Sequence, residues 1–406
     1  MSPRILEGVK VLDLTRVIAG PLCTQILADM GAIVYKIERP GEGDDTRRMG
    51  PFLPDAHGDD SNDSALYLAY NRGKRSVTID ISTPEGAALA RDLAMRCDIV
   101  MENYKVGTLA KYGLDYATLA ERKPGLVYCS LTGFGQNGPY AQRAAYDFIL
   151  QGLAGVMSTC GHADDAPGGG PMRTAIPITD VVTGLYAAIA ILGALLHQRR
   201  TGTGQYVDTS MLDASVALSG HLAVGYLMTG RLPARQGNTN PIAAPSEVFA
   251  CVDGRMILAA GNNAQFHALC EVLDRQDLAA DPRFASNASR VAHRTELRDL
   301  LAPLLAARRR ADLFPLFDRA GVPAGPINDL AQVFEDPQAR HRRLALSVPH
   351  GRGCGTPTLR SPLDFSATPV RYGPAPMLSQ HSTEVLRDEL GLEPARLEEL
   401  RARAII

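Results

Sequence analysis

Closely spaced cysteines are missing from this sequence. Its seven cysteines stand singly, with no CxxC pair and no Cys/His cluster of the kind that binds zinc. The odd number predicts reduced thiols, as in the cytosol, and each cysteine is explained most simply as a small buried hydrophobic residue. We therefore expect a cytoplasmic protein and predict no metal site.

Blocks of like charge are also missing. The net charge is −2 at pH 7, and the clearest run of like charge is the short Arg308–Arg310. This balance argues against nucleic acid as a partner. The first residues lack a basic stretch followed by an apolar one, so no secretory signal is expected. The apolar segment 181–197 is slightly short for a membrane span and begins at an acid, so we expect a core helix and no membrane contact.

Strand and helix patterns alternate in the first half of the chain. Residues 8–14 predict a strand, residues 21–32 a helix and residues 33–40 a second strand. Such β-loop-α-β units build parallel sheets, so the predicted fold class is α/β. From Gly225 onward, Pro/Gly loops alternate with short strands and then helices, which predicts a second, smaller α+β unit.

Asp180 stands out because it is the only charged residue between Arg173 and Arg199. It lies where an almost wholly apolar, Ala- and Leu-rich segment begins, and this composition predicts a buried helix. Thr179 or Asp180 is then the expected N-cap, where free backbone N–H groups and the helix dipole favour the ionised carboxylate. Two roles stay open on these grounds: a structural cap, or a nucleophile at the mouth of a pocket.

Two glycine-rich segments invite a functional interpretation. Gly133, Gly135 and Gly138 form a GxGxxG pattern, but Pro139 follows and no helix opens there, so a dinucleotide site is not predicted. We expect this loop to shape a pocket instead. The run 168–170 precedes Asp180 and suits a lid or a backbone oxyanion hole, although an ordinary surface loop fits equally well.

Several segments spread over the chain form a specific combined pattern, although each alone is weak. They are GVKVLDLTRVIAGP (8–21), GAIVYKIERPGEGDDTR (31–47), NRGKRSVTIDISTPEG (71–86), ENYKVG (102–107), GLVYCSLTGFGQNGPY (125–140), ITDVVTGLYAAIAILGALLHQRRTGTGQYVDTSMLDA (178–214) and GPINDL (325–330). With these segments the chain resembles the class III CoA-transferases, the family of formyl-CoA transferase and carnitine CoA-transferase, over nearly its whole length.

The resemblance implies an architecture. It implies a Rossmann-like large domain with a parallel sheet, a smaller α+β domain, and an interlocked homodimer in which each chain threads through the other. We accordingly expect the first part of a CoA-binding large domain at 1–224, the small domain at 225–328, and a return segment that completes the large domain at 329–406.

The resemblance also implies a reaction, the transfer of CoA from an acyl-CoA to a carboxylic acid. Asp180 matches the position of the family's covalent nucleophile. Its carboxylate attacks the donor thioester and forms an aspartyl anhydride, CoA converts this to an aspartyl-CoA thioester, and the acceptor acid reverses the steps. With an ordinary pKa of about 3.9, Asp180 would be ionised at neutral pH without a base. No tightly bound cofactor is implied, because CoA and acyl-CoA are substrates.

Matched positions imply contacts to CoA at its thioester end, its phosphates and its adenosine. These are, in that order, Val17 and Ile18; Arg39, Lys74 and Arg75; and Asn103, Tyr104 and Lys111. Some relatives carry Gln where this chain has Ile18, and the segment 259–264 lacks the glycine-rich run of formyl-CoA transferase. Both differences argue against formyl or oxalyl specificity.

The segments 14–21 and 38–47 are most similar to the dicarboxylate branch of the family, which uses succinyl-CoA. A second carboxylate needs a cation in the pocket. We prefer Arg47 over Arg16 and Arg72 because it ends the Gly/Asp-rich loop, and we expect Gly168, Gly169 and Gly170 to contact substrate.

The sequence leaves two alternative functions open. One is α-methylacyl-CoA racemase, but its histidine base would fall at Tyr146, which cannot readily act as a base at neutral pH. The other is a non-catalytic CoA-binding protein.

Overall fold

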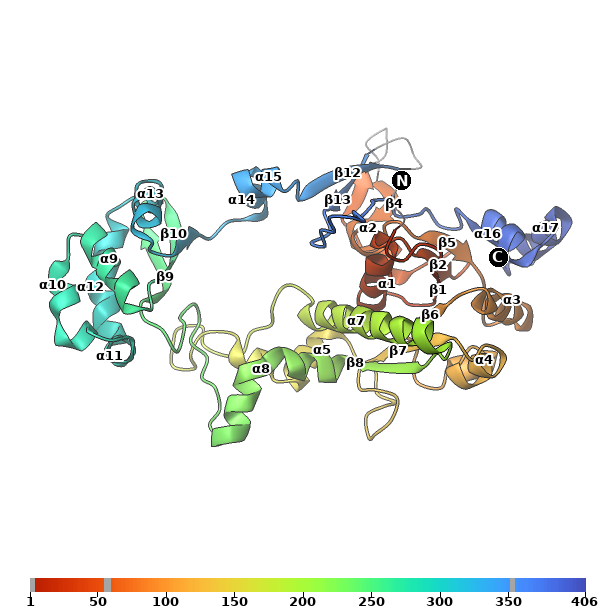
Figure 1. The fold of residues 1–406 in the computed structure, drawn as a ribbon, viewed down its shortest axis with the longest axis horizontal. Helices are drawn as coiled ribbons and strands as arrows, with labels where there is room; N and C mark the ends of the chain where they lie inside the picture. Colours follow the sequence, from red (N-terminus) through yellow and green to blue (C-terminus); the bar gives the residue numbers. More distant parts are fainter. Residues whose placement is uncertain (1–3, 55–59, 351–354) are drawn as a thin grey trace. The chain divides into compact units, whose positions relative to one another are not determined.

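The computed structural model describes residues 4–54, 60–350 and 355–406 (Figure 1). The chain forms two compact units. The first comprises Met1–Val156, Arg173–Arg231 and Arg340–Ile406, and the second Met157–Met172 and Leu232–Ala339. The domain boundaries at 225 and 328 stay a prediction.

A six-stranded sheet forms the centre of the first unit, and all its neighbouring strands are parallel. Its strand order is β5-β2-β1-β6-β7-β8. The strands are β1 (Lys10–Asp13), β2 (Ile33–Glu38), β5 (Arg75–Thr78), β6 (Ile99–Glu102), β7 (Val127–Thr132) and β8 (Tyr206–Ser210). The predicted α/β fold with a parallel sheet is confirmed.

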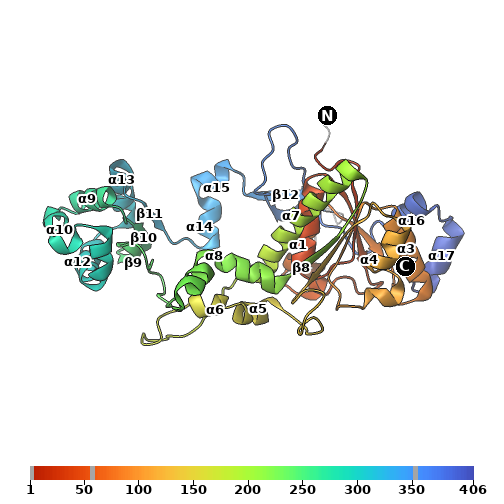
Figure 2. The same cartoon turned by 60° about the horizontal axis from the view of Figure 1, so that its bottom comes forward.

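Helices cover both faces of this sheet (Figure 2). One face packs against α1 (Ala19–Asp29) and α7 (Ile178–Thr201), and the other against α3 (Pro84–Met95), α4 (Tyr116–Arg122), α16 (Ser382–Leu390) and α17 (Pro394–Ala402). Neighbouring strand residues alternate between the two layers, as Val11 and Leu12 do. Because both faces are covered, the strands β2, β6 and β7 are apolar along most of their length rather than at every second residue.

Helix α7 approaches α1 closely at one point. A Cβ atom added at Gly184 would lie 2.6 Å from the carbonyl oxygen of Ala19, so only glycine permits this approach. Farther along, Ala187, Ile191 and Leu195 are buried in the same core. The close contact fixes the start of α7 against the start of α1.

Within the described ranges, two helices satisfy the length and composition of a membrane span, α7 and α8 (Met211–Thr229). A core helix of a globular protein meets the same criterion, and α7 contributes to the core as the sequence predicts for 181–197.

The remaining elements of the first unit surround this frame. They are η1 (Asp45–Arg48), β3 (Phe52–Pro54), β4 (Asp60–Ser64), α2 (Ala65–Tyr70), η2 (Leu109–Tyr112), α5 (Asp147–Leu153), β12 (Ala345–Pro349) and β13 (Gly355–Leu359). Elements α6 (Val156–Thr159) and α15 (Pro337–His341) each contribute residues to both units.

The second unit has its own core. A three-stranded antiparallel sheet, in the order β11-β10-β9, packs against helices whose apolar side chains, such as Phe266, Leu301 and Phe317, are buried. Its elements are β9 (Ser246–Cys251), β10 (Gly254–Ala259), α9 (Asn263–Val272), α10 (Gln276–Ala280), η3 (Pro282–Phe284), α11 (Asn287–Ala292), α12 (Arg294–Ala306), α13 (Arg310–Ala320), β11 (Ala324–Pro326) and α14 (Leu330–Glu335).

Candidate active site

The strand order reverses between β1 and β6. From β1 the chain builds the sheet outward through β2 and β5, and from β6 outward on the other side through β7 and β8. In open parallel sheets the loops at the carboxyl ends of the strands diverge at such a point and leave room for a ligand. Residues 16–19, which follow β1, and 103–106, which follow β6, line one common cavity.

This cavity has a volume of about 330 Å³ and is called the Asp180 cavity below. It brings together the predicted site residues Val17, Ile18, Asn103, Tyr104 and Asp180, which come from two loops and a helix distant in the sequence. A small reactive group and the acid that receives it fit in a space of this size.

A second cavity of about 260 Å³ adjoins the first, and is called the Arg39 cavity. Arg16, Asp45 and Tyr104 line both cavities, so the two form adjacent parts of one site. The guanidinium of Arg16 lies 5.1 Å from the centre of the Tyr104 ring. The predicted contact residue Arg39 thus lies at one end and Asp180 at the other, while Tyr104 belongs to both cavities.

Asp180 is not the N-cap of its helix, and neither is Thr179. Helix α7 begins at Ile178, so Asp180 lies inside its first turn and the predicted cap is wrong. Asp147, at the start of α5, takes that role from another helix: its Oδ1 accepts the Thr179 N–H at 2.9 Å and the Thr179 hydroxyl at 2.6 Å. The carboxylate of Asp180 is thereby left available to the cavity.

The protonation of Asp180 also differs from the prediction. Burial, together with the nearby charge of Asp147, raises the pKa of Asp180 to about 7. The cavity walls remove water that would stabilise the carboxylate, and Asp147 adds repulsion. The carboxylic acid and the carboxylate therefore coexist near pH 7, rather than the carboxylate alone.

The location of Arg47 corrects its predicted role in binding substrate. Arg47 as a whole is 5% exposed, and its guanidinium forms a bidentate pair with Glu38, with N···O distances of 2.7 and 2.9 Å. It also donates to the hydroxyl of Tyr67 and to the carbonyl of Pro376. Arg47 lines neither cavity, so its charge pairs with groups inside the protein and not with substrate.

Lys74 is likewise internal, which corrects the prediction that it contacts phosphate. Its ammonium group donates to Asp13, to the Pro21 carbonyl and to Asn71 at 2.9 to 3.1 Å, and these bonds use all three of its N–H groups. Burial lowers the pKa of Lys74 to about 8. The neighbouring Arg75 is partly exposed and pairs with Glu384 at 3.1 Å, outside both cavities.

Other predicted contacts are not brought to the cavities by the first unit. Lys111, in η2, is exposed and lines neither cavity. Gly168, Gly169 and Gly170 belong to the second unit, so their predicted role as a lid or substrate contact stays a prediction.

The predicted pocket-shaping role of the glycine loop is confirmed, because Gly133 lines the Asp180 cavity. A Cβ atom at Gly133 would lie 2.1 Å from that of Ala145, which lines the same cavity. Only glycine lets these two segments of the cavity wall meet.

Sequence patterns missed two residues that line this cavity and one that lies near Asp180. Asp147 belongs to no sequence motif. The only local feature that could have indicated it is its place as an acidic residue at the start of a short apolar helix. Arg143 lines the cavity, with its guanidinium 4.3 Å from the centre of the Tyr140 ring. Tyr70 lies near Asp180: burial and then the Asp180 charge raise the pKa of its hydroxyl.

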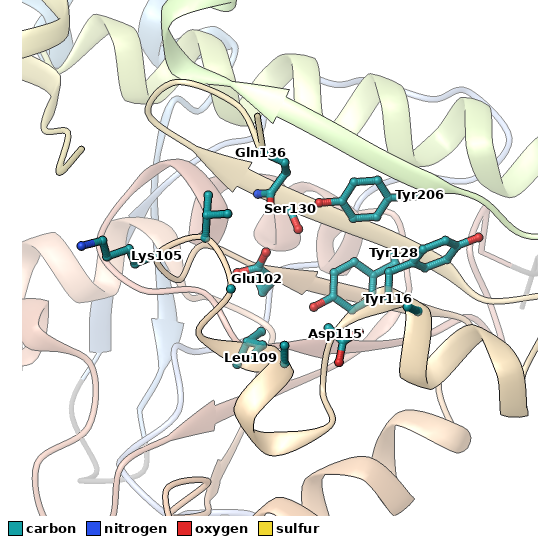
Figure 3. A pocket seen from close by; sticks show the side chains of 13 residues that line it. Glu102, Lys105, Leu109, Asp115, Tyr116, Tyr128, Ser130, Gln136 and Tyr206 are labelled. Atoms are coloured by element: carbon teal, nitrogen blue, oxygen red, sulfur yellow. The ribbon is translucent and has the colours of Figure 1, made fainter. Parts of the chain in front are cut away.

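A third cavity, of about 290 Å³, adjoins the loop that carries Asn103 and Tyr104 (Figure 3). Burial raises the pKa of its Glu102 to about 7, and the Glu102 carboxylate accepts the Tyr104 N–H at 2.7 Å. Tyr128 and Tyr206 form part of its aromatic wall, with ring centres 5.9 Å apart. Through this hydrogen bond, Glu102 holds the backbone of the loop that carries Tyr104.

Comparison with known proteins gives a consistent result. The model of CoA-transferase family III matches residues 6–382. The chain is 45% identical to the succinate–glutarate CoA-transferase of Agrobacterium fabrum, covering 94% of this chain and 95% of that protein. It is 37% identical to the human succinyl-CoA:glutarate CoA-transferase, covering 99% and 90%. A CAIB/BAIF family protein from Brucella suis has a similar crystal structure, with a TM-score of 0.86 and 42% identity, covering 96% and 100%.

Proposed function

This chain belongs to CoA-transferase family III, and we propose that it moves CoA from succinyl-CoA to a dicarboxylic acid such as glutarate. The main observation behind the proposal is the position of the Asp180 cavity, at the point where the strand order of the parallel sheet reverses. The chain has the same fold as the similar family protein of known crystal structure. The names of the similar proteins from Agrobacterium fabrum and human support the substrates.

Asp180 acts as the nucleophile in this proposal. Its carboxylate attacks the thioester carbon of succinyl-CoA, and CoA thiolate leaves as an aspartyl anhydride forms. The thiolate then attacks the aspartyl carbonyl of the anhydride, which releases succinate and leaves an aspartyl-CoA thioester. The acceptor carboxylate attacks that thioester, and the returning thiolate takes the acceptor acyl group from the second anhydride. Every step converts a thioester into an anhydride or an anhydride into a thioester, so the acyl group stays activated throughout.

The two cavities suit the two ends of an acyl-CoA. The Asp180 cavity would hold the thioester and the acid, with Val17 and Ile18 beside the thioester. The Arg39 cavity would hold the nucleotide end, with Arg39 and Tyr104 as its contacts. The half-exposed Arg16, which lines both, would lie beside the phosphates between them.

Exposed apolar side chains support the proposed interlocked homodimer. Leu185 and Ile189 of α7, and Leu227 and Met228 of α8, are between 44% and 80% exposed in the single chain. A patch of this kind is costly in water, and a second copy of the chain would bury it. From the scattered cysteines and the balanced charge of the sequence, we further propose a cytoplasmic protein without membrane or nucleic-acid partners.

A direct assay tests the proposed activity. The purified protein is incubated with succinyl-CoA and one acid at a time: glutarate, other dicarboxylates, and monocarboxylates of equal length. We expect a new dicarboxylyl-CoA and an equal amount of free succinate, separated by liquid chromatography. Transfer to monocarboxylates alone would contradict the dicarboxylate assignment, and no transfer to any acid would contradict the proposed function.

Arg143 is the cation we assign to the second carboxylate. It lines the Asp180 cavity, whereas Arg47 does not, and the other arginine of that cavity, Arg16, is the one proposed to lie beside the phosphates. Arg143→Ala is expected to raise KM for glutarate about tenfold, because a charge-assisted hydrogen bond is lost, and to leave KM for valerate unchanged. The matched variant Arg39→Ala should instead raise KM for succinyl-CoA. Equal changes for glutarate and valerate in Arg143→Ala would contradict the assignment.

A further inference from the structure

Val17 has an unusual backbone conformation for its side chain. Its φ is +74°, in the left-handed region that glycine favours and β-branched residues avoid. Among the described residues, the other non-glycine residues with positive φ are Asp274, Arg343, Ser379 and Ala404, and none of them is β-branched. Strain of this kind persists only where the surroundings enforce it, and it is common at active sites.

Side chains, rather than backbone, enforce this conformation. The ammonium group of Lys36 donates to the Thr15 carbonyl at 2.9 Å. Asn103 accepts the Arg16 N–H at 2.9 Å and donates to the Arg16 carbonyl at 2.8 Å. The next backbone group, the Val17 N–H, lies 3.3 Å from each carboxylate oxygen of Asp44. Consecutive backbone groups from Thr15 to Val17 are therefore held by three side chains.

Two of these side chains form a buried ion pair. Lys36 Nζ lies 2.9 Å from Asp44 Oδ2, and neither side chain has exposed surface. Asp44 also accepts the N–H and the hydroxyl of Thr46, at 3.0 and 2.7 Å. Burial acts to raise the pKa of Asp44, but the charge of Lys36 and these hydrogen bonds lower it to about 2. The pair therefore stays ionised, and it borders the Arg39 cavity without exposed side-chain surface.

The conformation of Val17 decides where the next residues lie. Ile18 precedes α1 as its N-cap, and Ala19 begins the helix; both line the Asp180 cavity. The first N–H groups of a helix have no intrahelical partners and carry partial positive charge. The contact between Ala19 and Gly184 sets the spacing from this helix start to α7, which carries Asp180.

We infer that Lys36 and Asp44 are positioning residues for CoA transfer, which hold Val17 in its left-handed conformation so that the start of α1 faces the thioester opposite Asp180. The inference rests on the proposed function. When the Asp180 carboxylate bonds to the thioester carbon, an electron pair moves onto the carbonyl oxygen, and it returns as the C–S bond breaks and thiolate leaves. The positive start of α1 would stabilise that transient negative charge if it is correctly aimed.

The experiment is a double-mutant cycle on Asp44 and Val17, with kcat and KM for succinyl-CoA measured beside the wild type. Asp44→Asn keeps the shape of the side chain but removes its charge, and we expect kcat to fall about 30-fold with KM changed less than threefold, since small misplacements carry such costs. Glycine adopts φ +74° without support, so Asp44→Asn/Val17→Gly should have a kcat at least about fivefold above that of Asp44→Asn.

Glu389→Gln is the matched control. Glu389 pairs with Lys10 at 2.7 Å and accepts from Tyr35, which neighbours Lys36 but points to the other face of β2. This variant should lower the melting temperature without a selective loss of kcat. If Asp44→Asn does not fold, Thr46→Val removes one hydrogen bond to Asp44 and should give a smaller loss of the same kind.

Three outcomes would overturn the inference. They are an unchanged kcat in folded Asp44→Asn, additive effects of Asp44→Asn and Val17→Gly, and a loss of kcat in Glu389→Gln equal to that in Asp44→Asn. A wild-type protein that transfers no CoA would instead contradict the proposed function, so the two failures are distinguished by the wild-type measurement.

Discussion

Replacing Asp180 with alanine is expected to lower kcat for CoA transfer by at least about 10³-fold, because in the proposed mechanism its carboxylate carries both the anhydride and the thioester. The affinity for succinyl-CoA should change little, since the site proposed for the nucleotide end is the separate Arg39 cavity. Steady-state kinetics and a binding titration on the same variant separate the two effects. A variant that keeps more than a tenth of the wild-type kcat would contradict the role of Asp180.

Mass spectrometry supplies the direct readout of the intermediate. Wild-type protein mixed with succinyl-CoA and digested should carry a CoA adduct on the peptide that contains Asp180, and Asp180→Asn should carry none. The alternatives give other results: a racemase would exchange the α-proton of its acyl-CoA in deuterated water without any acceptor acid, and a CoA-binding protein would bind without adduct or turnover.

Asp147→Asn is expected to have the second large effect, on the pH dependence of the reaction. The charge of Asp147 contributes to the raised pKa of Asp180, which is about 7. Since the carboxylate is the attacking form, kcat/KM should rise with pH up to about 7 in the wild type. Removing the Asp147 charge lowers the pKa of Asp180, so this rise should move to lower pH. The amide oxygen of Asn can still accept the Thr179 N–H and keep the cap.

The contribution of Asp180 to the stability of the fold should have the opposite pH dependence. A carboxyl group whose pKa is raised by folding favours the folded state below its unfolded pKa of about 3.9, and this contribution is lost as pH rises through about 7. The melting temperature of Asp180→Asn should therefore exceed that of the wild type at pH 8 but not at pH 4.

Asp213→Asn is the matched control for Asp147→Asn, because Asp213 also lies in the first turn of a helix but not in the Asp180 cavity. It should leave the pH profile of kcat/KM unchanged. If both variants shift the profile equally, a general change in charge explains the shift, and the proposed coupling between Asp147 and Asp180 is wrong.

Much of the fold was predictable from local patterns. The apolar runs 8–14 and 33–40 separated by a helix pattern predict parallel strands, and β1, α1 and β2 follow that order. The apolar segment after Asp180 predicts a core helix, which α7 confirms. These features are readable because strand and helix periodicity is a property of neighbours in the sequence.

The site was predictable only in part. The residues that the family resemblance marks near the thioester, Val17, Ile18 and Asp180, do line one cavity. Charge in a loop, however, does not reveal whether it faces solvent or the interior. Arg47 and Lys74 looked available for carboxylate and phosphate, but the fold buries them beside Glu38 and Asp13. A buried charge requires a close partner, and those partners are assigned by packing.

The sequence alone determined the α/β fold class, a core helix over 181–197 and Asp180 at its beginning, because the patterns that predict them are local in the chain. Only the tertiary structure decided the state of that carboxylate. Asp147, which caps α7 and repels Asp180, lies 32 positions before Thr179 on another helix. The pKa of Asp180 is a sum of burial and charges at short range in space, and such distances exist only after the chain has folded.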